Sequence, residues 1–231
     1  MNTLAKTTAA TIEDVSRITK ALPFMSLAQA TWIVRLIQEN RLTDILEIGF
    51  YHGVSTCYFA SAIAALSGHV TSIDIPFSAT ISPTAEEVLR ACNLESFVTL
   101  FRESAGAAWP LMKMIEAKKQ FDFCYIDDNH SWSVTGLHFF LVEKLLKPGG
   151  YILFDDLKWT IAASRIRRLK KQLADNPARF PPSMNTTGHD ITEEQKETPQ
   201  VGKVWELLVK QHQGFFNFQE IDGFGLCQKR L

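Results

Sequence analysis

The sequence predicts an α/β protein built on a doubly wound, mostly parallel sheet. From residue 44 to residue 154, short apolar runs alternate with helical patterns, and the connections between them are short. Repeating β-α units of this kind form parallel sheets with helices on both faces. Two further short runs, 215–221 and 224–229, are joined by Asp222-Gly223, which is a hairpin signal. The sheet is therefore expected to end in an antiparallel pair.

Five parallel strands are expected in the alternating region. They are assigned to residues 44–48, 69–74, 97–101, 121–126 and 151–154, and the helices to residues 55–67, 83–92, 107–118 and 132–146. The sequence Lys147-Pro-Gly-Gly150 is expected to form a tight turn before the fifth strand, because proline and glycine favour turns.

Two segments lie outside this alternation. Residues 1–40 are interpreted as an N-terminal helical layer, serving as a lid or a homodimer contact, with a short helix opened by Thr11 and an amphipathic helix over 26–40. Residues 41–231 are expected to form the main domain. Within it, residues 175–202 hold four of the nine prolines and predict a loop insertion.

Composition narrows the class of protein. A formal net charge of −1 argues against a nucleic-acid partner or a membrane surface, which would call for a basic field. No run of eighteen apolar residues and no secretory signal is found. The four cysteines are scattered without metal-type pairing, so buried free thiols in a cytoplasmic protein are expected.

A glycine turn follows the first expected strand. Gly49 and Gly53 would let the backbone turn sharply and let the next helix start close to the strand or a ligand. The spacing is neither a complete dinucleotide fingerprint nor a P-loop, and two glycines alone are more often a packing device than a ligand site. Glu47 favours a ligand site, because a carboxylate inside a buried strand needs a partner such as a ligand hydroxyl or ammonium.

Acidic residues stand at three other strand ends, where ligands bind in an open α/β sheet. They are Asp74, Asp127, Asp128, Asp155 and Asp156. Asp74 suits a diol, since one carboxylate can accept two hydroxyl hydrogen bonds, and Asp127, Asp155 and Asp156 could bind a hard divalent cation. Asp128 or Asp156 could instead cap a helix or form a turn.

These motifs resemble a known family when they are taken together. They are Leu46-Glu-Ile-Gly-Phe-Tyr-His-Gly-Val-Ser55, Ser72-Ile-Asp74, Phe121-Asp-Phe-Cys-Tyr-Ile-Asp127 and Leu146-Lys-Pro-Gly-Gly-Tyr-Ile-Leu-Phe-Asp-Asp156. They are similar to the class I S-adenosylmethionine-dependent methyltransferases, in the small-molecule O-methyltransferase branch that includes catechol O-methyltransferase and macrolide-sugar methyltransferases. The resemblance implies a Rossmann-like, seven-stranded sheet with an antiparallel last strand.

The resemblance also implies roles for individual residues. Glu47, Gly49, Gly53 and Ser55 would surround the methionine part of the cofactor, Asp74 would hold the ribose, Glu103 and Ser104 would lie at the adenine, and Asp127 would also face the cofactor. In the metal-dependent branch the acids after strands 4 and 5 bind Mg²⁺, which corresponds here to Asp127, Asp155 and Asp156. Catechol enzymes carry Asp-Asn at the second place, so Asp155-Asp156 adds a charge.

The implied reaction is methyl transfer to a hydroxyl of a small-molecule acceptor. His130 lies three residues past Asp127, where catechol-type enzymes carry a basic residue, and both are assigned as catalytic, with His130 taking the acceptor proton. Alternatively, His130 caps the following helix. His52, in the glycine turn, is expected to face solvent.

Other functions are compatible with the same scaffold. A cephalosporin-hydroxylase-like enzyme would share the acid-rich strand ends, and a catalytically silent partner would bind S-adenosylmethionine without transferring its methyl group. A nicotinamide-dependent dehydrogenase is disfavoured by the missing third glycine.

Overall fold

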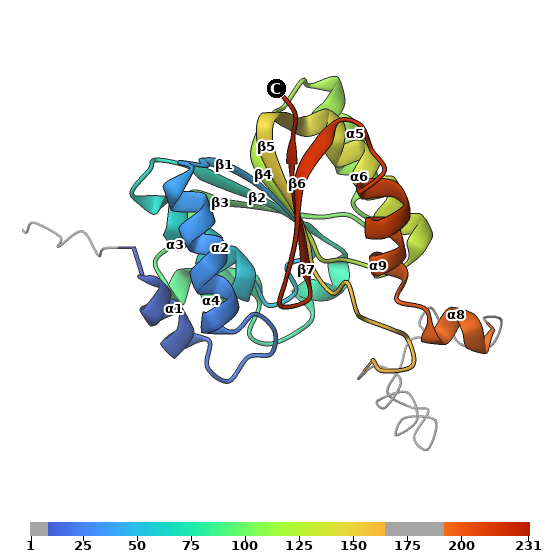
Figure 1. Cartoon of the computed structure of the whole chain (residues 1–231). Helices are drawn as coiled ribbons and strands as arrows, with labels where there is room; N and C mark the ends of the chain where they lie inside the picture. The colour runs from blue at the N-terminus through green and yellow to red at the C-terminus, as the bar shows by residue number, and fades with distance from the viewer. Residues whose placement is uncertain (1–8, 165–191) are drawn as a thin grey trace, which may run out of the picture.

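The computed structural model has one seven-stranded mixed sheet between two layers of helices (Figure 1). It describes residues 9–164 and 192–231. The strand order is β3-β2-β1-β4-β5-β7-β6, and only the pairs that involve β7 are antiparallel. The strands are β1 Asp44–Ile48, β2 His69–Asp74, β3 Val98–Arg102, β4 Phe121–Ile126, β5 Leu146–Phe154, β6 Phe215–Ile221 and β7 Phe224–Lys229. The predicted fold class is confirmed, including the closing hairpin.

The order of the sheet reverses between β1 and β4. β1 pairs with β2 on one side and with β4 on the other, so the chain winds outward in both directions from this point. In open α/β sheets a crevice forms outside the carboxyl ends of such neighbouring strands. The glycine turn after β1 and the acids after β4 therefore leave the sheet side by side.

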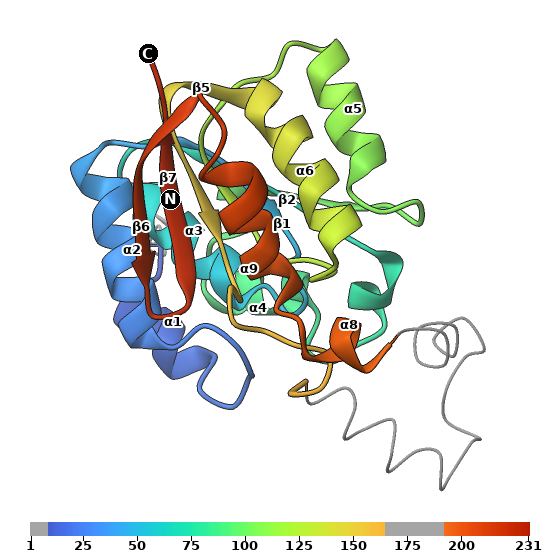
Figure 2. The ribbon, with the colours of Figure 1, turned by 45° about the vertical axis from the view of Figure 1, so that its right-hand side comes forward.

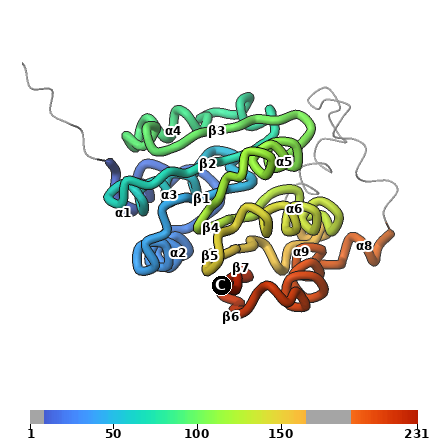
Figure 3. The backbone as a smooth tube through the Cα atoms, turned by 90° about the horizontal axis from the view of Figure 1, so that it is seen from above, coloured from blue at the N-terminus to red at the C-terminus, as the bar shows by residue number. Residues whose placement is uncertain are grey.

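Helices cover the two faces separately (Figures 2 and 3). Residues of α1–α4 share one apolar core with the sheet, and residues of α5, α6 and α9 share the other. The helices are α1 Ile12–Ile18, α2 Leu27–Glu39, α3 Val54–Ala64, α4 Ala85–Ala91, α5 Ala108–Glu116, α6 Trp132–Leu145, α8 Glu193–Glu197 and α9 Gln200–Val204, with 3₁₀ turns η1 Pro76–Ala79 and η2 Glu95–Phe97 and a π-helical turn η5 Trp205–Val209.

The N-terminal helices are packed into the main core. Thr11 and Ser26 each cap their helix through a capping box, as the sequence around Thr11 predicts. Ile33 and Ile37 of α2 are fully buried, and Trp32 makes an edge contact with Phe224 of β7. Residues 9–40 thus complete one face of the sheet, and their role as a lid or dimer contact stays a prediction.

Two predicted segments differ from the structure. Lys147 to Gly150 do not form a turn before β5 but belong to that strand, where the pairing with β4 shifts between Phe121 and Phe123. The irregularity accommodates Gly149 at φ +80° within a strand. Of the loop insertion predicted over 175–202, residues 175–191 lie outside the described residues, and the remainder includes α8 and the start of α9.

Two further observations concern the chain as a whole. All four cysteines are buried and free, as predicted. Among the described helices, none combines the length and the apolar character that crossing a membrane would demand.

Candidate functional site

The glycine turn packs closely against two other segments of the chain. Gly49 has φ +90°, and a Cβ there would lie 1.8 Å from the carbonyl oxygen of Asp127. Gly53 has φ +78°, and a Cβ there would lie 2.9 Å from Cβ of Ala85 in α4. Only glycine combines this backbone conformation with such close approach. Both glycines therefore serve packing, and the first brings the turn directly against the chain after β4.

Glu47 has partners within the protein. Its side chain is fully buried and accepts hydrogen bonds from Ser55 Oγ at 2.5 Å, Thr56 Oγ1 at 2.6 Å and Ser72 Oγ at 2.6 Å. Burial raises the pKa of Glu47 to about 7, and the three hydroxyl bonds oppose that rise. The acid thus ties the first turn of α3 to β1 and β2, and it needs no ligand to satisfy it.

Asp74, at the end of β2, closes the glycine turn from the other side. Its Oδ2 accepts the backbone N–H groups of Phe50 at 3.0 Å and Tyr51 at 2.7 Å, and its Oδ1 accepts that of Ile75 at 2.6 Å. The side chain is only partly buried. The two carboxylate oxygens offer about four acceptor positions and three of them are used, so Oδ1 can still accept one hydrogen bond from a ligand hydroxyl while Oδ2 holds the turn.

The residues predicted for the adenine lie beside Asp74. The backbone N–H of Glu103 donates to the carbonyl oxygen of Asp74 at 2.9 Å, and Ser104 follows on an exposed loop. Two apolar neighbours that no sequence motif marks, Ile75 and Phe77, are 46% and 41% exposed directly after β2. Exposed apolar side chains next to a polar strand end are suited to the flat face of a base.

The acid cluster after β4 and β5 is organised around His130. Its Nε2 lies 2.8 Å from Asp156 Oδ2 and 3.3 Å from Asp127 Oδ1, and its ring stacks on Trp159 at 4.8 Å. Ser131, not His130, caps α6. One ligand atom from each of Asp127, His130 and Asp156 falls within 4.8 Å of the others, a spacing compatible with one metal ion.

Asp155 lies outside this group but is connected to it through Tyr125, whose hydroxyl is 3.4 Å from Asp127 Oδ2. The Oδ2 of Asp155 accepts the hydroxyl of Tyr125 at 2.5 Å, and its Oδ1 accepts the backbone N–H of Asp156 at 2.6 Å. The predicted metal set of Asp127, Asp155 and Asp156 is thus brought together in part, with His130 in the place expected for Asp155.

The cluster shifts the pKa values of its members. Burial alone would lower the pKa of His130, but the hydrogen bonds to Asp127 and Asp156 raise it to about 10. Burial raises the pKa of Asp127, against the effect of His130. Burial, together with repulsion from Asp127, raises the pKa of Asp155 to about 8. In this arrangement His130 is a cation at neutral pH, held between two acids.

Two further histidines lie near the site: His138 was not singled out from the sequence, and His52 was expected to face solvent. His138 of α6 is buried with its Nδ1 at 2.5 Å from Asp128 Oδ2, so Asp128 anchors the loop that carries Asp127 and His130. His52 is buried rather than exposed to solvent, with its Nδ1 at 2.6 Å from the carbonyl oxygen of Pro83. No sequence pattern marks either contact, because each joins residues from separate elements.

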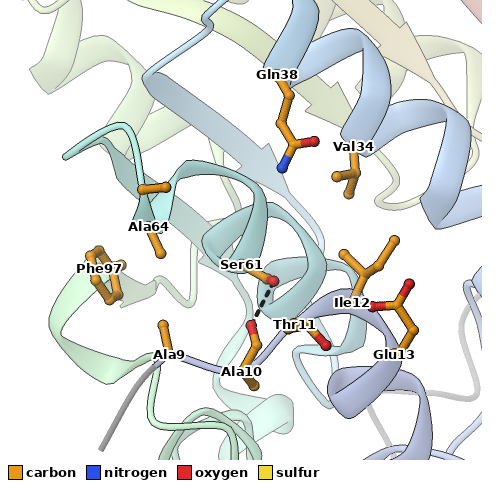
Figure 4. Close-up of a pocket in the computed structure, with 11 residues that line it drawn as sticks. Ala9, Ala10, Thr11, Ile12, Glu13, Val34, Gln38, Ser61, Ala64 and Phe97 are labelled. Atoms are coloured by element: carbon orange, nitrogen blue, oxygen red, sulfur yellow. Dashed lines mark hydrogen bonds between the residues drawn. The ribbon is translucent and has the colours of Figure 1, made fainter. Parts of the chain in front are cut away.

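A hollow of about 570 Å³ lies apart from these residues (Figure 4). It is lined by residues 9–13, α2, the end of α3 and Phe97, and Ser61 donates there to the carbonyl oxygen of Ala10 at 2.7 Å. A second hollow of about 620 Å³ lies between Trp132, α8 and α9. Trp132, at the start of α6, links this second hollow to the segment that carries His130.

Comparisons with known proteins agree with the fold. Residues 46–157 match the model of a family described as a methyltransferase domain. No curated protein matches the chain.

Solved structures cover almost the whole chain. A candidate caffeoyl-CoA O-methyltransferase from Staphylococcus aureus is 23% identical, with a TM-score of 0.65 over 95% of this chain and 92% of its own. An O-methyltransferase from Bacillus cereus in complex with SAH is 21% identical, with a TM-score of 0.63 over 98% and 94%. TomG, an O-methyltransferase from Streptomyces achromogenes in complex with SAM, is 17% identical, with a TM-score of 0.62 over 99% and 93%. At these identities the similarity establishes the fold alone.

Proposed function

We propose that this chain, which belongs to the class I S-adenosylmethionine-dependent methyltransferases, methylates a hydroxyl group of a small molecule. One observation carries the proposal. The glycine turn after β1 and the acid cluster after β4 meet at the reversal of the sheet, where Gly49 touches the backbone of Asp127. A cofactor bound along the turn and an acceptor bound at the acids would therefore lie side by side, as in-line transfer requires.

Bound S-adenosylmethionine would supply an electrophilic methyl group. Asp74 would accept a hydrogen bond from a ribose hydroxyl through Oδ1, while Ile75, Glu103 and Ser104 would border the adenine. For Glu47 an indirect role is proposed in place of direct cofactor contact, because its oxygens already accept three hydroxyl hydrogen bonds. It would position Ser55 and the start of α3, and thereby shape the turn around the methionine part.

The acid cluster fits a divalent cation. Asp127 and Asp156 offer carboxylate oxygens close together, the donor type that Mg²⁺ prefers. A cation there would lower the pKa of a bound hydroxyl. Asp155, whose carboxylate accepts the Tyr125 hydroxyl, would not contact the cation and would help to position the residues that do.

His130 is proposed as the base that takes the acceptor proton. A base must be neutral, and the pKa of about 10 keeps His130 protonated while both acids bond it. The role therefore requires that another positive charge neutralise Asp127 and Asp156, which would return the pKa of His130 towards its usual value. Trp159, stacked on the imidazole, would keep the ring facing the acids.

The direct test measures transfer of a labelled methyl group from S-adenosylmethionine to a panel of catechols, other phenols and sugars. We expect a methylated hydroxyl, loss of activity after exhaustive chelation, and recovery with Mg²⁺ or Mn²⁺. Cofactor binding without transfer to any acceptor would favour a silent partner, and an oxygenated product would favour a hydroxylase. Full activity after chelation would refute the metal site.

The cellular compartment, the class of partner and the oligomeric state are part of the same proposal. Four free, buried thiols fit a reducing, cytoplasmic compartment. We propose a small molecule, rather than nucleic acid or membrane, as the partner, given a net charge of −1. Homodimer formation through the N-terminal helices also stays a prediction.

A further inference from the structure

Arg102, the last residue of β3, contacts three other segments around Asp74. Its Nε donates to Ser78 Oγ at 2.9 Å, and its two terminal nitrogens donate to the carboxylate of Glu86 at 2.6 and 2.8 Å. The guanidinium also lies over the ring of Phe50, 5.1 Å from its centroid. The hydrogen bond from Arg102 lowers the pKa of Glu86, so the pair is ionised at neutral pH.

Ser78 and Phe50 belong to segments that contact Asp74, and Glu86 belongs to the helix that packs against the glycine turn. Ser78 lies in η1 and donates to the carbonyl oxygen of Ile75 at 3.0 Å, so it fixes the exposed apolar residues that follow β2. Phe50 lies in the glycine turn, and its N–H donates to Asp74. Glu86 follows Ala85, the residue of α4 against which Gly53 packs.

One side chain thus connects β3, η1, α4 and the glycine turn. β3 itself is the edge strand of the sheet, so the segments at its end have no further strand beside them. The planar guanidinium suits this task, because it can form a bidentate pair and lie on an aromatic ring at the same time. A lysine ammonium has no such fork and could keep only part of these contacts.

We infer that Arg102 is the positioning residue for the adenosine half of the cofactor site. The inference rests on the proposed function, since it takes Asp74 as the ribose contact and Ile75 as the border of the adenine. Arg102 acts through its neighbours: it holds Phe50 against Asp74 on one side and η1 on the other. Without it, the separation between the ribose and adenine contacts would no longer be fixed.

Two nucleoside probes separate the two halves of the cofactor site. S-adenosylhomocysteine occupies the whole site, whereas 5′-methylthioadenosine lacks the amino-acid part. By calorimetry, Arg102→Met should weaken binding of both by the same factor, about tenfold, the order expected when a bidentate charged pair no longer holds a binding segment in place. Arg102→Lys should not restore the affinity. Glu86→Gln should also weaken the binding of both probes.

The combination of variants distinguishes positioning from simple destabilisation. Arg102→Met combined with Glu86→Gln should bind no more weakly than Arg102→Met alone, since both changes break one pair. Lys113→Met, which removes an exposed pair with Glu116 on α5, should leave both affinities unchanged. If Arg102→Met does not fold, Glu86→Gln alone tests the inference, through its affinities for the two probes.

Three results would overturn the inference: unchanged affinity for both probes, a loss for S-adenosylhomocysteine alone, or full rescue by lysine. Failure of the wild-type protein to bind either probe is a separate result, because it would reject the cofactor assignment itself.

Discussion

The buried carboxyl group of Glu47 gives a prediction whose size can be worked out. Glu47→Gln replaces an ionisable group by a neutral one of the same shape. Folding raises the pKa of Glu47 from 4.5 to about 7, so the folded state binds this proton more tightly than the unfolded state does. Its contribution to stability is therefore present below pH 4.5 and is lost as the pH rises through 7.

The magnitude follows from the two pKa values. A tenfold change in an acid dissociation constant corresponds to about 1.4 kcal/mol, so the full effect of Glu47 is about 3 kcal/mol, of which about 2.5 kcal/mol falls between pH 5 and pH 8.5. Wild-type stability should fall by that amount relative to Glu47→Gln over this range. Any constant offset, from amide contacts with Ser55, Thr56 and Ser72, cancels in the comparison.

The assay is urea unfolding of both proteins at several pH values, with the free energy of unfolding extrapolated to water. Glu116→Gln, on the surface of α5, is the control and should follow the wild-type profile. Wild-type and Glu47→Gln curves that run parallel from pH 5 to pH 8.5 would show that Glu47 does not titrate as its burial and its hydroxyl partners imply.

Two further predictions address the glycine turn and the acid cluster. Gly49→Ala should lower the free energy of unfolding by about 3 kcal/mol or more, because alanine is strained in the left-handed conformation and its Cβ would also clash with the carbonyl oxygen of Asp127. Gly106→Ala, at φ +79° with open space around it, should lower it by about 1 kcal/mol, because only the backbone strain applies there. Equal losses in urea unfolding would contradict that contact. The pKa of His130, followed by NMR, should be about 10 in the metal-free protein. It should fall on Asp156→Asn or on adding Mg²⁺, because each reduces the negative charge beside the imidazolium. An unchanged pKa in Asp156→Asn would contradict the cluster as described.

The strand framework and the position of the site could be predicted from the sequence, because both follow local patterns. β1, β2 and β4 have the predicted ends, and Asp74 and Asp127 stand at their carboxyl edge as expected. Such boundaries depend on apolar runs and turn residues that lie close together in the chain. The bulged start of β5 was missed because Pro-Gly-Gly is equally typical of a turn and of an irregular strand.

The partners of the buried groups could not be predicted in the same way. Ser72 faces Glu47 because β1 and β2 pair in that register, and the register is a property of the assembled sheet. The hydroxyl of Tyr125 bonds Asp155, whereas the neighbouring Asp156 bonds His130. These choices depend on side-chain directions after folding, so the sequence predicts which chemical groups gather at the edge but not which of them pair.

Binding of S-adenosylmethionine is the measurement that tests the central claim most directly. Calorimetry should show that the wild-type protein binds the cofactor, and that Asp74→Ala binds it about 10- to 100-fold more weakly, since hydrogen bonds to a charged group contribute about 1.5–3 kcal/mol. Asp222→Asn, at the exposed tip of the β6–β7 hairpin, should bind like the wild type. Wild-type protein that does not bind S-adenosylmethionine, or Asp74→Ala that binds it with unchanged affinity, would contradict the account.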